Sequence, residues 1–172
     1  EVGGPVTNEG KEMIGAKDKL LRQVRGNDVS FIFQEPRTSL NPLQTIEKQV
    51  GESLELHQGL TRGAARARVL ELLEKVGIRD AQSRLNAYPH ELSGGQRQRV
   101  MIAMALANKP DILIADEPTT ALDVTIQAQI LELLNELKES ENMGLLFITH
   151  DLGVVQRFAD TVCVMKNGEI VE

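Results

Sequence analysis

Two carboxylates follow directly after an apolar stretch of strand length, residues 112–115. They are Asp116 and Glu117. An apolar strand that carries two charged groups to its carboxyl end is costly unless a cation or a proton source lies there. In nucleotide-hydrolysing sites, one such carboxylate orders Mg²⁺ and the next polarises the attacking water. The alternative is that the pair caps the following helix, and the pair alone does not decide between the two.

Two further apolar stretches also end in polar side chains. The stretch 145–148 is followed closely by His150 and Asp151, and the stretch 29–33 is followed by Gln34. A histidine there can donate a hydrogen bond to a phosphate oxygen, or it can belong to a helix start that Asp151 caps. In a parallel sheet the carboxyl ends of the strands share one edge, so we expect these side chains to lie close together.

A serine and two glycines precede a run of small and apolar residues at 100–107. Ser93 is a good helix N-cap, and Gly94 and Gly95 let the backbone approach a ligand closely. A helix start with free N–H groups is an anion site, although such glycines also occur in ordinary turns.

The composition excludes several classes of protein. The 172 residues include 19 Lys and Arg against 25 Asp and Glu, a net charge of −6, which argues against a nucleic-acid partner. No run approaches the roughly 20 apolar residues that a membrane span needs. The single cysteine, Cys163, excludes a disulfide framework and a cysteine metal cluster.

The elements that must position these residues follow an α/β order. Helical signals run from about residue 46 to 108, including a helix that Thr61 caps and Gly77 ends. Helices are also predicted after Asp123 and over 151–159, and Asn167-Gly168 predicts a hairpin turn. Strands are predicted over 29–33, 112–115, 145–148 and 161–165. This alternation predicts a parallel sheet wrapped by helices.

Taken together, these residues resemble the ATP-binding subunits of ABC transporters. Residues 92–96 look like the family's signature motif and 112–117 like its Walker B motif. Gln34 resembles the Q-loop glutamine, 121–123 the D-loop and His150 the switch histidine. All five occur in the family's order, and the match covers nearly the whole chain.

The resemblance implies a role for each matching residue. Asp116 serves Mg²⁺, Glu117 is the catalytic base, His150 contacts the γ-phosphate of ATP, and Gln34 senses Mg²⁺ or water. The cofactors implied are ATP and Mg²⁺.

The resemblance also implies partners. Ser93, Gly94, Gly95 and Gln96 bind the nucleotide held by a second ABC ATPase domain in a head-to-tail dimer, with Asp123 at the junction. Transmembrane permease subunits are expected to dock in the groove between Gln34 and the helical segment. The protein is then peripheral to the cytoplasmic face of the bacterial inner membrane.

The implied fold is α/β, a P-loop NTPase-like ABC ATPase core with a parallel sheet and an inserted helical subdomain. Within a partial nucleotide-binding domain over 1–172, the helical subdomain spans 46–109, and 29–45 and 110–172 belong to the core. A Walker A motif, Gly-x-x-x-x-Gly-Lys-Ser/Thr, is absent. The nearest candidate runs from Gly10 to Gly15, but Ala16 follows where the motif requires lysine. We therefore expect the N-terminal part of the domain to be missing and the 172 residues alone to be inactive.

Three segments resemble one branch of the family. Residues 33–42, 88–91 and 116–123 are similar to the ATPases of bacterial oligopeptide, dipeptide and nickel importers, close to the microcin C type of peptide uptake. The expected function is to energise import of peptides or peptide-like compounds. The alternative is a soluble ABC-type ATPase that works on ribosomes or DNA.

Overall fold

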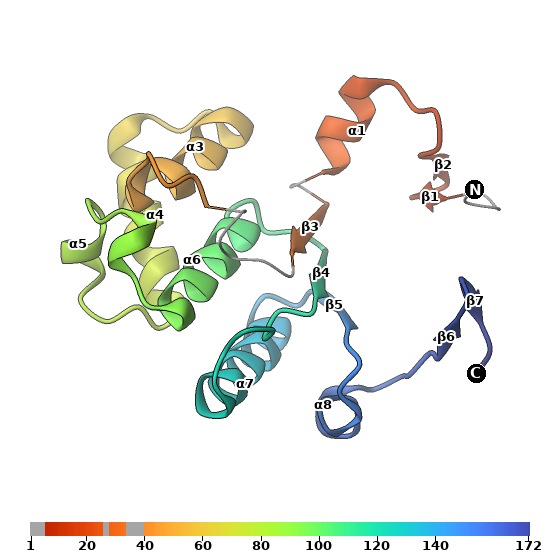
Figure 1. The fold of residues 1–172 in the computed structure, drawn as a ribbon. Helices are drawn as coiled ribbons and strands as arrows, with labels where there is room; N and C mark the ends of the chain where they lie inside the picture. Colours follow the sequence, from red (N-terminus) through yellow and green to blue (C-terminus); the bar gives the residue numbers. More distant parts are fainter. Residues whose placement is uncertain (1–5, 26–27, 34–39) are drawn as a thin grey trace.

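A three-stranded parallel sheet lies at the centre of the computed structural model, which describes residues 6–25, 28–33 and 40–172 (Figure 1). The strands are β3 (Val29–Ile32), β4 (Ile112–Asp116) and β5 (Gly144–Ile148), in the order β3-β4-β5. In the register of β4 with β5, Asp116 lies opposite Ile148. The predicted α/β class with a parallel sheet is confirmed.

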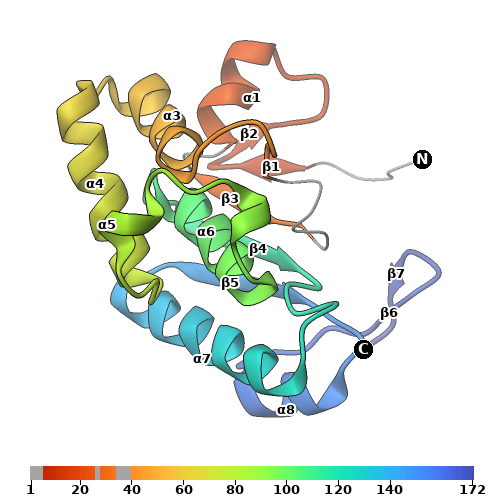
Figure 2. The ribbon, with the colours of Figure 1, turned by 60° about the vertical axis from the view of Figure 1, so that its left-hand side comes forward.

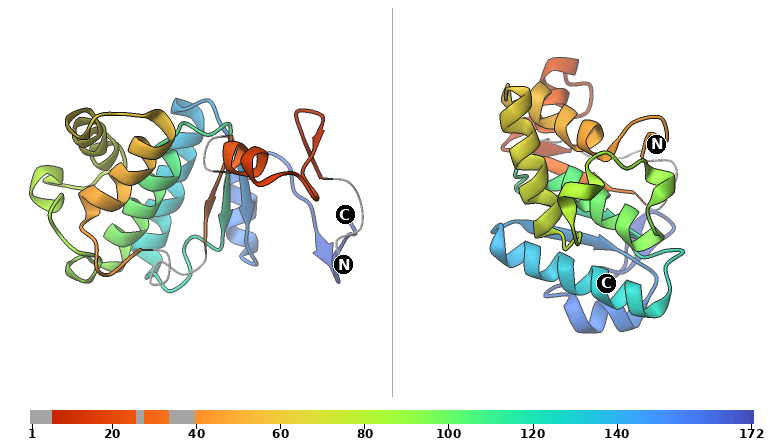
Figure 3. Two further views of the ribbon diagram at one scale, coloured as in Figure 1. Left: turned by 90° about the horizontal axis from the view of Figure 1, so that it is seen from above. Right: turned by 90° about the vertical axis from the view of Figure 1, so that its left-hand side faces the viewer.

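The helices α3 (Ile46–Gln58), α4 (Arg62–Lys75), α6 (Gly94–Leu106) and α7 (Val124–Ser140) lie on one side of this sheet (Figure 3, left). Side chains of the strands alternate accordingly. Ile32, Leu113 and Ala115 are buried toward the helices, whereas Phe31 and Leu146 remain 46% and 53% exposed. In the described part of the chain, this second face is therefore less well covered than the sheet wrapped by helices that the sequence predicts.

Residues 46–106, which precede β4, are largely helical, as predicted. Figure 2 shows α6 against the sheet, with α3 and α4 farther out. Thr61 caps α4 as expected, with its hydroxyl accepting the Ala64 N–H. The buried residues of α4 are Ala65, Val69, Leu72 and Leu73. The elements of this segment are α3 (Ile46–Gln58), α4 (Arg62–Lys75), α5 (Ala81–Arg84), the 3-10 turn η1 (Pro89–Glu91) and α6 (Gly94–Leu106).

An arginine joins α6 to the end of α4. The Arg99 Nη1 donates a hydrogen bond of 2.6 Å to the Val76 carbonyl, one of the groups that a helix end leaves without a partner. Burial of this guanidinium lowers the pKa of Arg99. Gly77 follows with φ +75°, and a Cβ there would lie 2.8 Å from Arg99 Nη1. The glycine thus provides both a left-handed turn and room for the arginine.

The C-terminal region matches the prediction only in part. α7 (Val124–Ser140) and α8 (Leu152–Phe158) form as expected, and β6 (Met165–Lys166) pairs with β7 (Glu169–Ile170) through the predicted turn. The strand predicted over 161–165 is wrong, since only its last residue belongs to a strand. An apolar stretch needs a neighbouring strand to complete its hydrogen bonds, and residues 161–164 join no strand of the central sheet.

The remaining elements lie before the sheet in sequence. They are β1 (Thr7–Asn8), β2 (Lys11–Glu12) and α1 (Asp18–Val24). Among the described residues, no helix combines the length and the apolar character that a membrane span requires.

The contact between Gly77 and Arg99 predicts an unequal cost of two glycine substitutions. Gly59 is the matched control, because it also has a positive φ but a Cβ added to it would meet nothing within 4 Å. We expect Gly59→Ala to lower the free energy of unfolding by about 1–2 kcal/mol through backbone strain. Gly77→Ala should cost about 1 kcal/mol more, because the arginine loses its hydrogen bond.

Denaturant unfolding measures both free energies. In an Arg99→Met background the excess cost of Gly77→Ala should disappear. An excess that persists in that background would show that the arginine contact is not its cause.

Candidate functional site

The carboxyl ends of β4 and β5 bring the predicted carboxylates and histidine together. Asp116 is the last residue of β4, and the Glu117 N–H donates to the Ile148 carbonyl at 2.9 Å. Glu117 has φ 46°, a left-handed conformation that is strained for a residue with a side chain. The strand register and this bond together point Glu117 toward the end of β5.

Glu117 and His150 form a direct pair. The Glu117 Oε1 lies 2.6 Å from His150 Nδ1 and also accepts the His150 backbone N–H at 3.2 Å. The Glu117 side chain is 18% exposed and that of His150 is 87% exposed. One carboxylate oxygen therefore holds residue 150 twice, while Glu117 Oε2 accepts a long 3.4 Å hydrogen bond from the Thr120 hydroxyl.

The pair changes the titration of the histidine. The hydrogen bond that the His150 ring donates to Glu117, and then the negative charge of Glu117, raise the pKa of His150 above 6.5, and the neighbouring Asp151 adds to this. A raised pKa means that the ion pair exists while His150 is protonated and is lost as the pH rises through that pKa. The site therefore holds a proton more firmly than an isolated histidine does.

The residue after the histidine has the alternative role that the sequence allowed. The Asp151 carboxylate caps α8 by accepting the N–H groups of Gly153 at 2.8 Å and Val154 at 3.4 Å. The helix start after β5 is therefore stabilised without His150, whose ring pairs with Glu117 instead.

The start of α6 is fixed by a reciprocal pair of hydrogen bonds. Ser93 is the N-cap as predicted: its hydroxyl accepts the Gln96 N–H at 3.2 Å, and Gln96 Oε1 accepts the Ser93 N–H at 2.9 Å. A Cβ on Gly95 would lie 2.8 Å from the Ile126 side chain. Gly95 thus lets α6 approach α7, a packing reason that the sequence alone did not reveal.

The start of α7 lies beside the start of α6. Asp123 caps α7 by accepting the Ile126 N–H at 3.0 Å. A Cβ on Gly94 would touch Leu122 at 3.4 Å, which places the residue before Asp123 next to the α6 start. The structure thus brings the signature-like residues and Asp123 into one neighbourhood.

Of the two residues expected to bind a metal ion, Asp116 and Gln34, the structure describes only Asp116. Gln34 lies outside the described residues, and the described part of the chain holds no cluster of three or more His, Cys, Asp or Glu residues suited to a metal. Mg²⁺ is usually held by one or two carboxylates together with water and substrate phosphates rather than by a protein cage. The half-buried Asp116 at a strand end fits that donor set.

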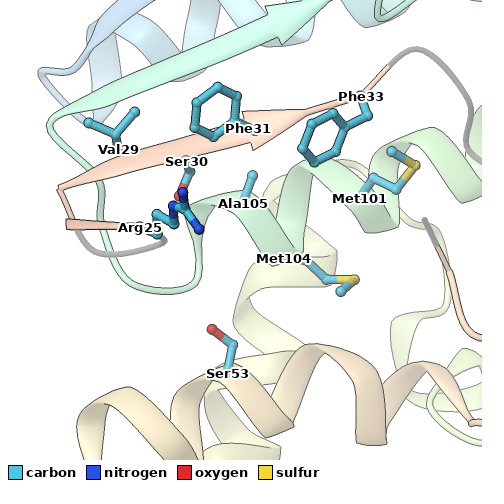
Figure 4. A pocket seen from close by; sticks show the side chains of 9 residues that line it. All are labelled: Arg25, Val29, Ser30, Phe31, Phe33, Ser53, Met101, Met104 and Ala105. Carbon is cyan, nitrogen blue, oxygen red and sulfur yellow. The ribbon is translucent and has the colours of Figure 1, made fainter. Parts of the chain in front are cut away.

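A groove of about 590 Å³ lies between β3 and the helices (Figure 4). Phe33 follows β3 at one wall, and Met101 and Met104 come from α6. The other lining residues are Arg25, Val29, Ser30, Phe31, Ser53 and Ala105. The groove is largely apolar, and it opens between the sheet and the helical segment.

The chain belongs to the ABC transporter family, because residues 3–120 match that family. It is 68% identical over 169 residues to the peptidoglycan transport ATP-binding protein YejF of Agrobacterium fabrum, which covers 98% of the chain and 31% of the relative. It is 54% identical over 169 residues to the oligopeptide transport ATP-binding protein OppD of Bacillus subtilis. This match covers 98% of the chain and 47% of OppD. The chain thus spans between about a third and a half of these relatives.

The fold is also that of solved ABC cassettes. The dimeric, post-hydrolysis structure of the cassette MJ0796 with ADP and Pi superposes with a TM-score of 0.85 at 34% identity. It covers 99% of this chain, which in turn covers 72% of that one. The predicted ABC ATPase fold is confirmed.

The Glu117–His150 pair predicts a shifted titration. By NMR of the histidine rings in the intact protein, His150 should titrate above pH 6.5, because Glu117 stabilises its charged form. In Glu117→Gln the midpoint should fall, since the amide carries no charge. An unchanged His150 midpoint in this variant would contradict the pair.

Proposed function

We propose that the intact protein is the ATP-hydrolysing subunit of a bacterial ABC importer for peptides or peptide-like compounds. The observation that carries the proposal is the Glu117–His150 pair beside Asp116, at the edge of the sheet where α/β proteins bind ligands. The names of YejF and OppD, which both refer to transport, support a role in transport.

In this proposal Glu117 is the general base. Its Oε1 is held by residue 150, so the second oxygen, Oε2, is placed to accept a proton from water that attacks the terminal phosphate of ATP. His150 keeps the carboxylate oriented through Nδ1 and reaches the γ-phosphate with the opposite ring nitrogen. The strained backbone of Glu117 supports a functional role, because such strain concentrates at active sites.

Asp116 would hold Mg²⁺ directly or through water, together with Gln34. The ion would neutralise phosphate charge. Asp116 suits this role because it is half-buried and lies at the strand end next to the base.

The proposal includes a head-to-tail pair of cassettes. Ser93, Gly94, Gly95 and Gln96 would clamp the nucleotide that a second cassette holds, with Asp123 at the junction. The capped start of α6 offers backbone N–H groups and the positive end of a helix dipole, both of which favour phosphate. The dimeric cassette MJ0796 supports this arrangement.

We further propose the domain division that the resemblance implies. The helical subdomain spans 46–109, and 29–45 and 110–172 belong to the core. The contacts of α3, α4 and α6 with one another, and of α6 with β3, support a helical unit that packs on the sheet from one side.

The groove beside β3 is the proposed receptor for the permease. Phe33, Met101 and Met104 provide an apolar lining, and methionines adapt to the shape of a partner. The protein would thereby be held at the cytoplasmic face of the bacterial inner membrane. The soluble ribosome- or DNA-associated alternative is less well supported, because YejF and OppD are transport proteins.

Replacing the base tests the proposal. In the intact protein, Glu117→Gln should lower ATP turnover by at least about 100-fold while ATP affinity stays within about threefold of wild type. Phosphate release measures the turnover, and equilibrium titration with ATP measures the affinity.

Glu136→Gln is the matched control, because Glu136 is an exposed glutamate on α7. It should behave as wild type. Near-normal turnover in Glu117→Gln would refute the role of Glu117 as base.

A further inference from the structure

A buried glutamine in the first turns of α3 holds the loop that precedes this helix. The Gln49 side chain is only 5% exposed. Its oxygen accepts the Asn41 N–H at 2.8 Å, and its amide donates to the Asn41 carbonyl at 3.0 Å and to the Gln44 carbonyl at 2.8 Å. Both amide hydrogens are therefore used, and three backbone groups of the loop depend on one side chain.

The same end of α3 also binds a second segment of the chain. Ile46 and Glu47 are at the start of the helix, where N–H groups have no partner within the helix. The Ile46 N–H donates to the Ala87 carbonyl, and the Glu47 N–H donates to the Leu85 carbonyl, each at 2.9 Å. Leu85 is fully buried, so this segment is also anchored in the core.

One of these segments follows Gln34 in the sequence, and the other precedes Ser93. Asn41 lies seven residues after Gln34, and the segment at Leu85 and Ala87 leads through η1 to the N-cap Ser93. The loop is anchored ahead of Asn41 as well, because the Leu40 side chain is buried in the core. Both segments are thus held by two adjacent turns of one helix.

We propose that the start of α3 is a junction between the chain that follows Gln34 and the chain that leads to Ser93, with Gln49 as the positioning residue that closes it. Because both segments bind the same rigid helix, a displacement of the loop at Asn41 is carried to the approach to Ser93. The inference rests on the proposed function for its effect on turnover, but the junction itself does not.

The test uses the intact protein and two glutamines of α3. Gln49→Met keeps the length of the side chain and removes all three hydrogen bonds. Gln49→Glu retains the acceptor for the Asn41 N–H and loses both donated bonds. Gln58→Met is the control on the same helix, because the more exposed Gln58 amide donates to the Ala107 carbonyl at 2.9 Å and to Asn108 Oδ1 at 3.3 Å, both outside the junction.

We expect both Gln49 variants to lower kcat for ATP by about tenfold per folded molecule, with KM within about twofold of wild type. The reason is that a misplaced Ser93 affects the reacting geometry rather than the first capture of ATP. Gln58→Met should leave both parameters within about twofold. An equal loss in Gln58→Met, unchanged kcat in the Gln49 variants, or a loss confined to KM would overturn the proposal.

Hydrogen–deuterium exchange tests the junction independently of activity and of the variants. In the wild-type protein the N–H groups of Asn41, Ile46 and Glu47 should open together, with similar protection. Unrelated protection of these three would overturn the junction even if the protein hydrolyses ATP. Concerted protection in a protein that hydrolyses no ATP would instead refute the proposed function and leave the junction standing.

Discussion

The site depends on the parallel pairing of β4 with β5 and on the bond that this pairing permits. The register sets Asp116 opposite Ile148, so Glu117 and His150 emerge at the same edge. The Glu117 N–H then donates to the Ile148 carbonyl. Glu117 Oε1 forms hydrogen bonds with the backbone N–H and the ring Nδ1 of His150. A slip of the register by one residue would turn these side chains to opposite faces. The chemistry proposed for the protein therefore rests on strand pairing.

The helical layer holds the second set of residues by equally local means. Ser93 and Gln96 cap α6 reciprocally, and the glycine at 95 lets α6 pack against Ile126 of α7. Arg99 ties the same helix to the end of α4. The start of α6 is thus fixed in both position and direction, as the phosphate-binding role proposed for it requires.

Much of this could be predicted from the sequence, because the relevant chemistry is local. The caps at Thr61, Ser93 and Asp151 are confirmed. They could be predicted because each depends on a side chain and an N–H two or three residues away. The gathering of Glu117 and His150 followed from parallel strand topology. Their direct bond did not, because it depends on the register.

Other features required the three-dimensional structure. The three bonds of Gln49 link a helix to a separate loop, and an isolated buried glutamine gives no such signal. The strand predicted over 161–165 does not form at 161–164, because an apolar stretch becomes a strand only beside a partner strand, and the sequence does not show which partner is near.

A double-mutant cycle on ATP turnover tests most directly whether Glu117 and His150 act as one unit. It compares Glu117→Gln, His150→Ala and the double variant of the intact protein. If the bond between the two side chains creates the active arrangement, the ATP turnover of the double variant should be no more than about threefold below that of the slower single variant. Losses that multiply in the double variant would show that the two residues act independently, and would contradict the account.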